Sequence, residues 1–164
     1  MNRDWRKWLL LISAGIIALD RLTKIWVSHH IAEGDAITVI PRVFRITHVM
    51  NSGAAFSLFE NSPSPERVRW LLTGFSILAA VVVFAFILRI GRKLTLTTFA
   101  LALILGGAIG NVYDRIRYSM VTDFLEVHLY HYHWPDFNVA DSAIVIGGIL
   151  MLLDAFRSSP DTSS

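Results

Sequence analysis

VTDF at residues 121–124 and FNVADS at residues 137–142 each carry one aspartate, Asp123 in the first and Asp141 in the second. Asp141 lies at the start of a long apolar run, Val139 to Phe156. A carboxylate at the mouth of a helix of membrane length is costly, so its presence indicates a function. Two carboxylates that lie close together can share one proton and activate a water molecule. The two stretches therefore predict a carboxylate site, provided that the rest of the chain brings them together.

The composition indicates a membrane protein of one domain, residues 1–164. Of its residues, 54% are hydrophobic and only 17% are charged, and the mean hydropathy is +0.51. A soluble domain carries roughly 25% charged residues. The net charge of +2 and the lack of a long basic run argue against nucleic acid as a partner. The chain has no cysteine, which excludes disulfides, a thiol nucleophile and thiolate metal ligands.

Four apolar segments predict membrane-spanning helices, at about residues 8–27, 70–88, 94–112 and 139–156. Within the first, Asp20 and Lys24 are four positions apart and share a helix face, which favours a structural ion pair over direct chemistry. In the third, Gly106 and Gly110 have the spacing that lets another helix approach closely. A polar tail, residues 158–164, follows the last span.

The connections between spans, residues 28–69 and 113–138, are polar. Residues 36–40 and 43–49 are rich in β-branched side chains, which predicts two short strands. Successive spans alternate in direction, so both connections lie on one side of the membrane. The other side carries the short basic segments, and the positive-inside rule makes that side cytoplasmic, with both termini on it. The polar residues expected on the outer side are Asp20, Lys24, Asn51, Asn111, Asp114, Arg115, Asp123, Asn138 and Asp141.

The residues alone leave other chemistries open. No serine lies in a Gly-x-Ser-x-Gly elbow, although Lys24 could activate one. A metal site could use the group Glu126, His128, His131 and His133, which lacks the His-Glu-x-x-His pattern. Helix capping alone would explain Asn138 and Asp141. The alternatives to an enzyme are a small polytopic transporter or proton-path protein that uses the same buried acids, and a structural membrane protein.

Five motifs in order carry a resemblance to a known family. They are Asp20-x-x-x-Lys24, Asn51-x-Gly53-Ala54-Ala55-Phe56, Gly106-Gly107-Ala108-x-Gly110-Asn111-x-x-Asp114-Arg115, Val121-x-Asp123-Phe124 and Phe137-Asn138-x-Ala140-Asp141-Ser142. From about Trp8 to Phe156, the sequence resembles the bacterial lipoprotein signal peptidases, also called signal peptidase II. Ser119 departs from this pattern, since many relatives have glycine there.

The resemblance implies an all-α membrane protein with four transmembrane helices, a small periplasmic β-cradle, and a short periplasmic helix or flap after Asn51. It implies an aspartic endopeptidase of the bacterial inner membrane, with its site near the periplasmic face. Such an enzyme cuts a prolipoprotein before a diacylglyceryl-modified cysteine, acts as a monomer among membrane lipids, and needs no cofactor or metal.

The resemblance also assigns roles to individual residues. Asp123 and Asp141 match the catalytic pair. The positions that match substrate-binding residues are Asn51, Gly53, Asn111, Arg115 and Asn138. The positions that match supporting residues are Asp20, Lys24 and Asp114.

The sequence also predicts how the catalytic pair divides one proton. Asp141 lies in the first turn of a helix, where the helix dipole stabilises negative charge. No helix begins near Asp123 in the sequence. We therefore expect the charge on Asp141 and the proton on Asp123, an order that Arg115 would reverse if it paired with Asp123.

Overall fold

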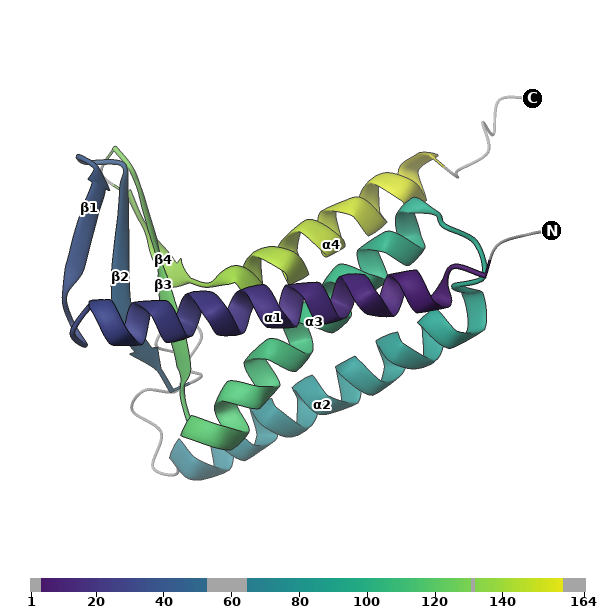
Figure 1. The fold of residues 1–164 in the computed structure, drawn as a ribbon, viewed down its shortest axis with the longest axis horizontal. Helices are drawn as coiled ribbons and strands as arrows, with labels where there is room; N and C mark the ends of the chain where they lie inside the picture. The colour runs from purple at the N-terminus through teal and green to yellow at the C-terminus, as the bar shows by residue number, and fades with distance from the viewer. Residues whose placement is uncertain (1–3, 53–64, 131, 158–164) are drawn as a thin grey trace.

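The computed structural model describes residues 4–52, 65–130 and 132–157, in which four helices pack beside one sheet. The helices are α1 (Arg6–His30), α2 (Pro65–Ile90), α3 (Leu96–Tyr118) and α4 (Val139–Arg157). The strands are β1 (Ala36–Ile40), β2 (Phe44–Asn51), β3 (Val121–Leu129) and β4 (Tyr132–Phe137). The sheet stands at one end of the helices, whereas α1 begins and α4 ends at the other end (Figure 1).

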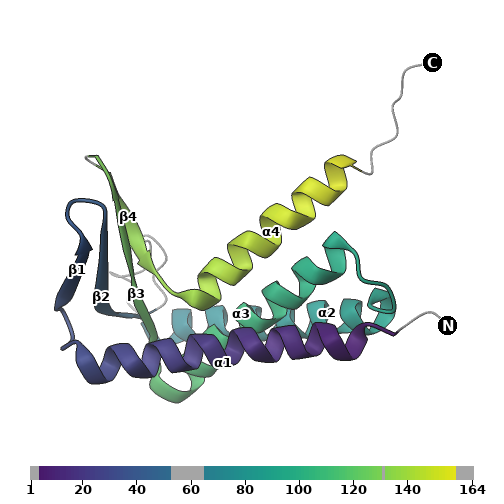
Figure 2. The same ribbon diagram turned by 45° about the horizontal axis from the view of Figure 1, so that its top comes forward.

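Helix α3 is the centre of the helical part and contacts α1, α2 and α4 (Figure 2). Its small residues allow this close packing. A Cβ atom on Gly106 would lie 2.8 Å from the backbone oxygen of Ser13 in α1. A Cβ atom on Gly110 would lie 2.8 Å from Oδ2 of Asp20. The glycine spacing noted in the sequence therefore brings α1 and its acidic side chain against α3.

The sheet is antiparallel with the strand order β1-β2-β3-β4. The two predicted strands are confirmed as β1 and β2. Strands β3 and β4 were not predicted, because residues 113–138 were expected to be only a polar connection. Val121 to Phe124 are all buried and show no alternation, but residues 125–129 do alternate between apolar and polar side chains, which is a strand signal in the sequence. The sheet is thus larger than a two-stranded cradle.

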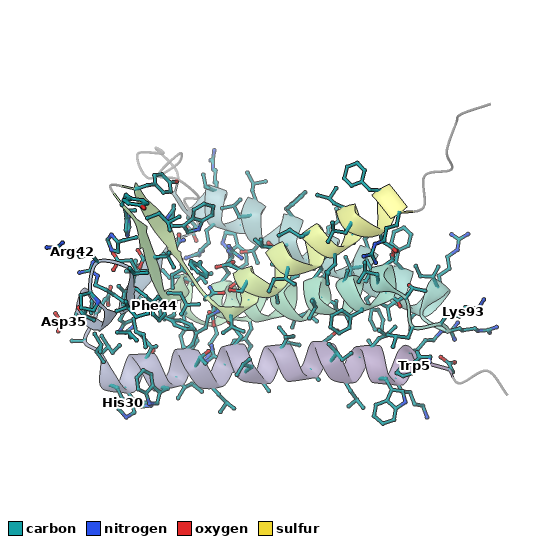
Figure 3. All side chains as sticks on the ribbon, turned by 90° about the horizontal axis from the view of Figure 1, so that it is seen from above. Trp5, His30, Asp35, Arg42, Phe44 and Lys93 are labelled. Carbon is teal, nitrogen blue, oxygen red and sulfur yellow. The ribbon has the colours of Figure 1, made fainter. Side chains whose placement is uncertain are left out.

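The sheet docks on the helices through a small apolar cluster, which fixes where β3 lies. Val27 and Ile31 at the end of α1 pack with Phe124 of β3, and Val139 at the start of α4 packs against them. The labelled side chains of Asp35 and Arg42 lie at the sheet end, opposite Trp5 and Lys93 at the other end (Figure 3). This packing holds Asp123, next to Phe124, beside the first turn of α4.

Helix α3 is longer than the predicted span, which ended at residue 112. It continues to Tyr118 and ends at Ser119, whose φ of 66° is left-handed. Asp114 and Arg115, which were expected at the helix exit, therefore lie on the helix, as Asn111 does. Within this extension, Asp114 is buried.

The outer faces of the helices are apolar. Leu71 and Phe75 of α2 are each 72% exposed, and Phe156 of α4 is 77% exposed. Apolar surface of this extent is unusual on a soluble monomer and indicates contact with lipid. By length and composition, three helices among the described residues could cross a membrane: Glu66–Ile90 within α2, then α3 and α4. Helix α1 is 25 residues long but carries Asp20, Arg21 and Lys24.

Candidate active site

Asp123 is the third residue of β3 and is 2% exposed. Both of its carboxyl oxygens accept hydrogen bonds from asparagine amides. Asn138 Nδ2 donates to Asp123 Oδ1 over 2.7 Å, and Asn51 Nδ2 donates to Oδ2 over 2.9 Å. Asn51 ends β2 and Asn138 follows β4. The two strands that flank β3 therefore hold the carboxyl group of Asp123 in one position.

Asp141 lies in the first turn of α4, where Asn138 caps the helix. The cap is reciprocal: Asp141 N–H donates to Asn138 Oδ1 over 2.9 Å, and Asn138 N–H donates to Asp141 Oδ2 over 3.2 Å. The N-cap read from the sequence is therefore confirmed. The other carboxyl oxygen, Oδ1, accepts from Asn111 Nδ2 over 2.7 Å. Helix α3 thus orients Asp141 from the opposite side.

Asn138 joins the two aspartates and is fully buried. Its side-chain nitrogen contacts Asp123, and its backbone nitrogen contacts Asp141. The same side-chain nitrogen lies 3.3 Å from Asn111 Oδ1. One asparagine therefore bridges β3, α3 and α4, and capping is only part of its role.

Burial raises the pKa of Asp123 to about 7. The hydrogen bond from Asn51 opposes this rise, the negative charge of Asp141 adds to it, and Asn138 and Lys24 oppose it. A carboxyl group that ionises near neutral pH can both give and take a proton during a reaction. The negative charge of Asp141 therefore acts directly on the protonation of Asp123.

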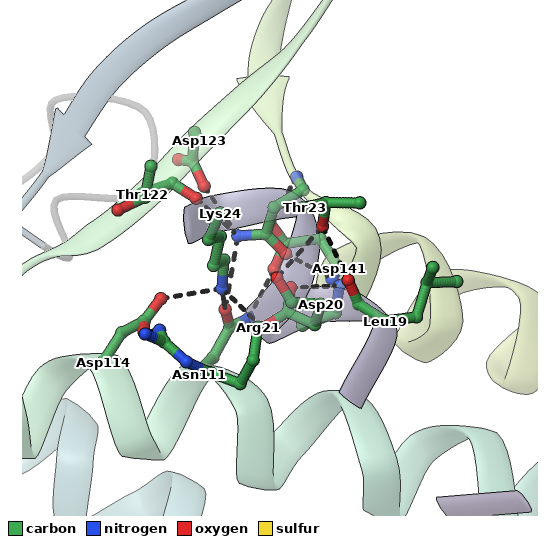
Figure 4. Close-up of polar contacts among 12 residues, drawn as sticks. Leu19, Asp20, Arg21, Thr23, Lys24, Asn111, Asp114, Thr122, Asp123 and Asp141 are labelled. Atoms are coloured by element: carbon green, nitrogen blue, oxygen red, sulfur yellow. Dashed lines mark hydrogen bonds and ion pairs between the residues drawn. The ribbon is translucent and has the colours of Figure 1, made fainter. Parts of the chain in front are cut away.

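The buried ammonium group of Lys24 supports the site through contacts with α1 and α3. Lys24 Nζ lies 2.8 Å from Asp20 Oδ2 and 2.7 Å from Asp114 Oδ2, and it donates to Asn111 Oδ1 over 3.3 Å (Figure 4). The expected pair of Asp20 with Lys24 is confirmed. Arg21 Nη1 lies 2.5 Å from Asp114 Oδ1. Lys24 thus connects the acidic residues of α1 and α3 to the asparagine that orients Asp141.

Two of these supporting contacts were not predicted. Asp20 Oδ1 accepts the backbone N–H of Ala140 over 3.1 Å, so it ties α1 to the first turn of α4. Arg21 pairs with Asp114, 93 positions away, and its guanidinium lies 4.6 Å from the ring centre of Tyr113. The only sequence signal for Arg21 is its place beside Asp20 in an apolar helix, where an unpaired charge is costly.

Arg115 lies close enough for its charge to act on both Asp123 and Asp141. Its Nε is buried without a hydrogen-bond partner among the residues that the structure describes. A buried donor of this kind is available to a carbonyl group that enters the site. Gly53, the remaining predicted site residue, and the stretch expected to form a flap lie outside the described residues.

The cluster is close to electrical balance. Three cations, Lys24, Arg21 and Arg115, face four carboxyl groups on Asp20, Asp114, Asp123 and Asp141. One proton held by the aspartate pair would bring this set to neutrality. The arrangement therefore suits a pair that shares one proton and moves it.

The histidine cluster noted in the sequence forms elsewhere on the sheet. Glu126, His128 and His133 come together there, whereas His131 lies outside the described residues. Within the described part of the chain, their side-chain hydrogen bonds and ion pairs join them to Arg45, to Asp136 and to one another.

Comparison with known proteins shows which family the chain belongs to. A family model described as signal peptidase (SPase) II matches residues 12–157. The lipoprotein signal peptidase of Desulforapulum autotrophicum is 42% identical over 154 residues, which cover 93% of this chain and 94% of the relative. That of Alteromonas mediterranea is 40% identical over 154 residues, which cover 94% of this chain and 83% of the relative.

A solved structure has the same fold. It is a bacterial membrane enzyme determined by the in meso method, with a TM-score of 0.85 and 25% sequence identity. The match covers 100% of this chain and 97% of that chain. The motifs, the fold and the sequence matches agree over nearly the whole length, and the chain belongs to the signal peptidase II family.

Proposed function

We propose that this protein is an aspartic endopeptidase that removes signal peptides from prolipoproteins, with Asp123 and Asp141 as its catalytic pair. One observation carries the proposal: Asn138 bonds both carboxyl groups and so holds them on the two sides of one small site. The names of the relatives support the substrate class. The raised pKa of Asp123 supports acid-base chemistry near neutral pH.

In the proposed reaction, the ionised Asp141 takes a proton from a water molecule, and the resulting hydroxide adds to the scissile carbonyl carbon. The helix dipole and the N–H groups of the first turn favour the charge on Asp141. Asp123 holds the other proton and gives it to the substrate, after which the C–N bond breaks and the amine leaves protonated. At the end of the reaction Asp141 is protonated and Asp123 is ionised. Transfer of one proton from Asp141 to Asp123 restores the starting state.

Substrate backbone is held by donors around the pair. Arg115 Nε has no partner among the described residues and can donate to a carbonyl oxygen. Asn51 and Asn111 each place an amide nitrogen within 3 Å of a catalytic carboxyl oxygen. Fixed donors next to the reacting carbon stabilise the oxyanion that forms in the transition state.

We place all four helices across the bacterial inner membrane, with both termini in the cytoplasm. The charged residues of α1 turn inward and pair with one another, so they do not prevent α1 from crossing. The sheet and the aspartate pair then lie near the periplasmic face. A lipidated cysteine would enter sideways from the bilayer, and each buried CH₂ of its acyl chains would contribute about 0.8 kcal/mol. We expect the enzyme to work as a monomer, because one chain supplies both aspartates and the asparagines that bond them.

A cleavage assay on a lipidated precursor tests this function. Asp123→Asn and Asp141→Asn should each remove nearly all cleavage. The first change removes the proposed proton donor, and the second removes the proposed base that takes a proton from water. Asp35→Asn, at an exposed position between α1 and β1, serves as the matched control and should cleave normally. Near-normal turnover in either catalytic variant would refute the assignment of the two aspartates as the catalytic pair. Equal cleavage of an unlipidated precursor would refute the lipid requirement.

A further inference from the structure

A second group of polar side chains lies on one face of the sheet, apart from the aspartate pair. Arg45 of β2 is the register partner of Glu126 of β3, and His128 of β3 is the register partner of His133 of β4. Glu126 and His128 are two positions apart on the same strand, so their side chains share a face. The pattern sets a carboxylate and two imidazoles side by side across β3 and β4, with Arg45 of β2 next to the carboxylate.

The ligating atoms of this group converge on one oxygen. Nε2 of His133 lies 2.8 Å from Oε1 of Glu126, and Nε2 of His128 lies 3.2 Å from the same oxygen. The ligand atoms of all three residues lie within 4.8 Å of one another. Tetrahedral ligands at the usual Zn–N distance are separated by about 3.3 Å. A small adjustment of the side chains would therefore place one ion within reach of all three.

We propose that Glu126, His128 and His133 form a binding site for a borderline divalent transition-metal ion, of the kind that Zn²⁺ represents. Two imidazoles and a carboxylate suit such ions, whereas Mg²⁺ and Ca²⁺ prefer oxygen ligands alone. Three protein ligands leave a fourth position for water or for Asp136, whose Oδ2 lies 3.9 Å from His133 Nε2.

Arg45 orients the carboxylate of Glu126 for metal binding. It bonds both oxygens of Glu126, through Nε to Oε2 and through Nη2 to Oε1. This two-point pairing holds the carboxylate in a fixed orientation beside the two imidazoles. A bound ion would take Oε1 while Arg45 Nε keeps Oε2. Partners that orient a ligating carboxylate in this way strengthen metal sites.

The imidazoles must change tautomer when the ion binds. A ring nitrogen that faces a carboxylate oxygen at 2.8 Å carries its proton on that nitrogen. The ion would replace this proton on Nε2, and each neutral ring would carry its proton on Nδ1 instead. The side chains of His128 and His133 are 30% and 48% exposed, so an ion can reach them from water.

Such an ion would join β3 to β4. Strand β3 carries Asp123, and β4 leads directly to Asn138, so the hairpin sets the spacing between them. An ion that binds only the folded protein raises the free energy of unfolding by RT ln(1 + [ion]/Kd). The site therefore stabilises the hairpin without taking part in peptide cleavage.

The test uses the full chain in detergent without a histidine tag, which would itself bind the ion. Calorimetric titration with ZnCl₂ should give one ion per chain and a rise in melting temperature. Glu126→Gln, His128→Gln and His133→Gln should each weaken binding by about tenfold or more. Titration with Co²⁺ should produce the visible absorption bands of a tetrahedral site, and these bands should vanish in the same variants.

Two controls keep the test specific. His29→Gln changes an exposed histidine on α1, and Asp123→Asn changes the aspartate pair, so neither should alter Zn²⁺ affinity. Each variant's shift is compared with its own metal-free melting temperature, so a loss of stability cannot imitate a loss of binding. Unchanged affinity in both His128→Gln and His133→Gln, absence of stoichiometric binding, or loss of binding in Asp123→Asn overturns the proposal.

Discussion

Asn138 donates a hydrogen bond from Nδ2 to Oδ1 of Asp123 over 2.7 Å, across 15 positions of sequence, while its own backbone begins α4. The residue therefore has two separable functions, as an N-cap and as an amide donor to Asp123. Serine caps helices about as well as asparagine but is too short to replace the amide donor. We expect Asn138→Ser to keep most of the thermal stability and to lower kcat on the order of a hundredfold through misplacement of Asp123.

Asn138→Ala provides the comparison, because alanine removes the cap as well. It should cost a further ~1 kcal/mol of unfolding free energy relative to Asn138→Ser. Unfolding in mixed micelles and cleavage of a lipidated precursor measure the two effects separately. A serine variant with full activity would show that Asp123 does not depend on this donor.

The stability of the protein should depend on pH through Asp123. Its folded pKa of about 7 lies above the value near 3.8 for an exposed aspartate, so the folded state holds a proton that the unfolded state has lost between these values. Stability from this group is therefore complete at low pH and is lost as pH rises through 7. We expect the melting temperature of Asp123→Asn, relative to the native protein, to rise from pH 5 to pH 8. A difference that stays constant over this range would contradict the assignment.

The same titration bears on cleavage. If Asp123 is the proton donor, then turnover should fall as pH rises above about 7, because the donor has lost its proton. The charge of Asp141 influences the pKa of Asp123, so the rate profile alone does not identify the donor. Infrared spectroscopy of the resting enzyme does so: a protonated carbonyl band should vanish in Asp123→Asn and persist in Asp141→Asn. The opposite pattern would reverse the two roles.

The helices and the helix cap were predictable from sequence for physical reasons. Apolar runs of membrane length have few other uses, and the order of Asn138 and Asp141 before such a run is typical of an N-cap. Asp20 and Lys24 were predictable as a pair because helix geometry alone brings positions four apart together.

The rest of the site depends on contacts that no local pattern encodes. Arg21 meets Asp114 only because α1 and α3 pack closely, and Asp20 meets the backbone of Ala140 for the same reason. The first residues of β3 are buried on both faces and show no alternation, whereas residues 125–129 alternate and could have predicted the second half of the strand. Pairing between distant segments is decided by tertiary packing, which a single sequence does not display.

Lys24 should be essential for stability, because it is 1% exposed and lies between two carboxylates. Lys24→Met leaves Asp20 buried without its cation, whereas Asp114 keeps Arg21. Loss of one partner from a buried ion pair typically costs about 3–5 kcal/mol. The double variant Lys24→Met with Asp20→Asn should recover much of this loss, since asparagine has no charge and keeps an oxygen for Ala140 N–H. Unfolding in mixed micelles measures both variants, and a single variant of native stability would contradict the role of Lys24.

Single cysteines test the orientation in the membrane, since the chain has none of its own. Tyr130, in the turn between β3 and β4, is fully exposed, and Lys93 is exposed between α2 and α3. In intact spheroplasts, we expect a membrane-impermeant maleimide to label Tyr130→Cys and to leave Lys93→Cys unlabelled until the membrane is opened. Labelling of Lys93→Cys alone from outside would invert the proposed topology.

Ser119 was expected to replace a glycine of the resembled family, and its backbone has a conformation that favours glycine. With a φ of 66° at the end of α3, the residue adopts the left-handed conformation that costs an L-residue roughly 1–2 kcal/mol. Glycine avoids this cost but loses about 0.4–1 kcal/mol through the greater freedom of the unfolded chain. The first effect is larger, so Ser119→Gly should raise the unfolding free energy by about 0.5–1 kcal/mol. Ser76→Gly, in the interior of α2, is the matched control and should lower it by about 0.5 kcal/mol, because glycine is a poorer helix former than serine. If both changes destabilise the protein equally, then the left-handed backbone at Ser119 carries no strain that glycine relieves.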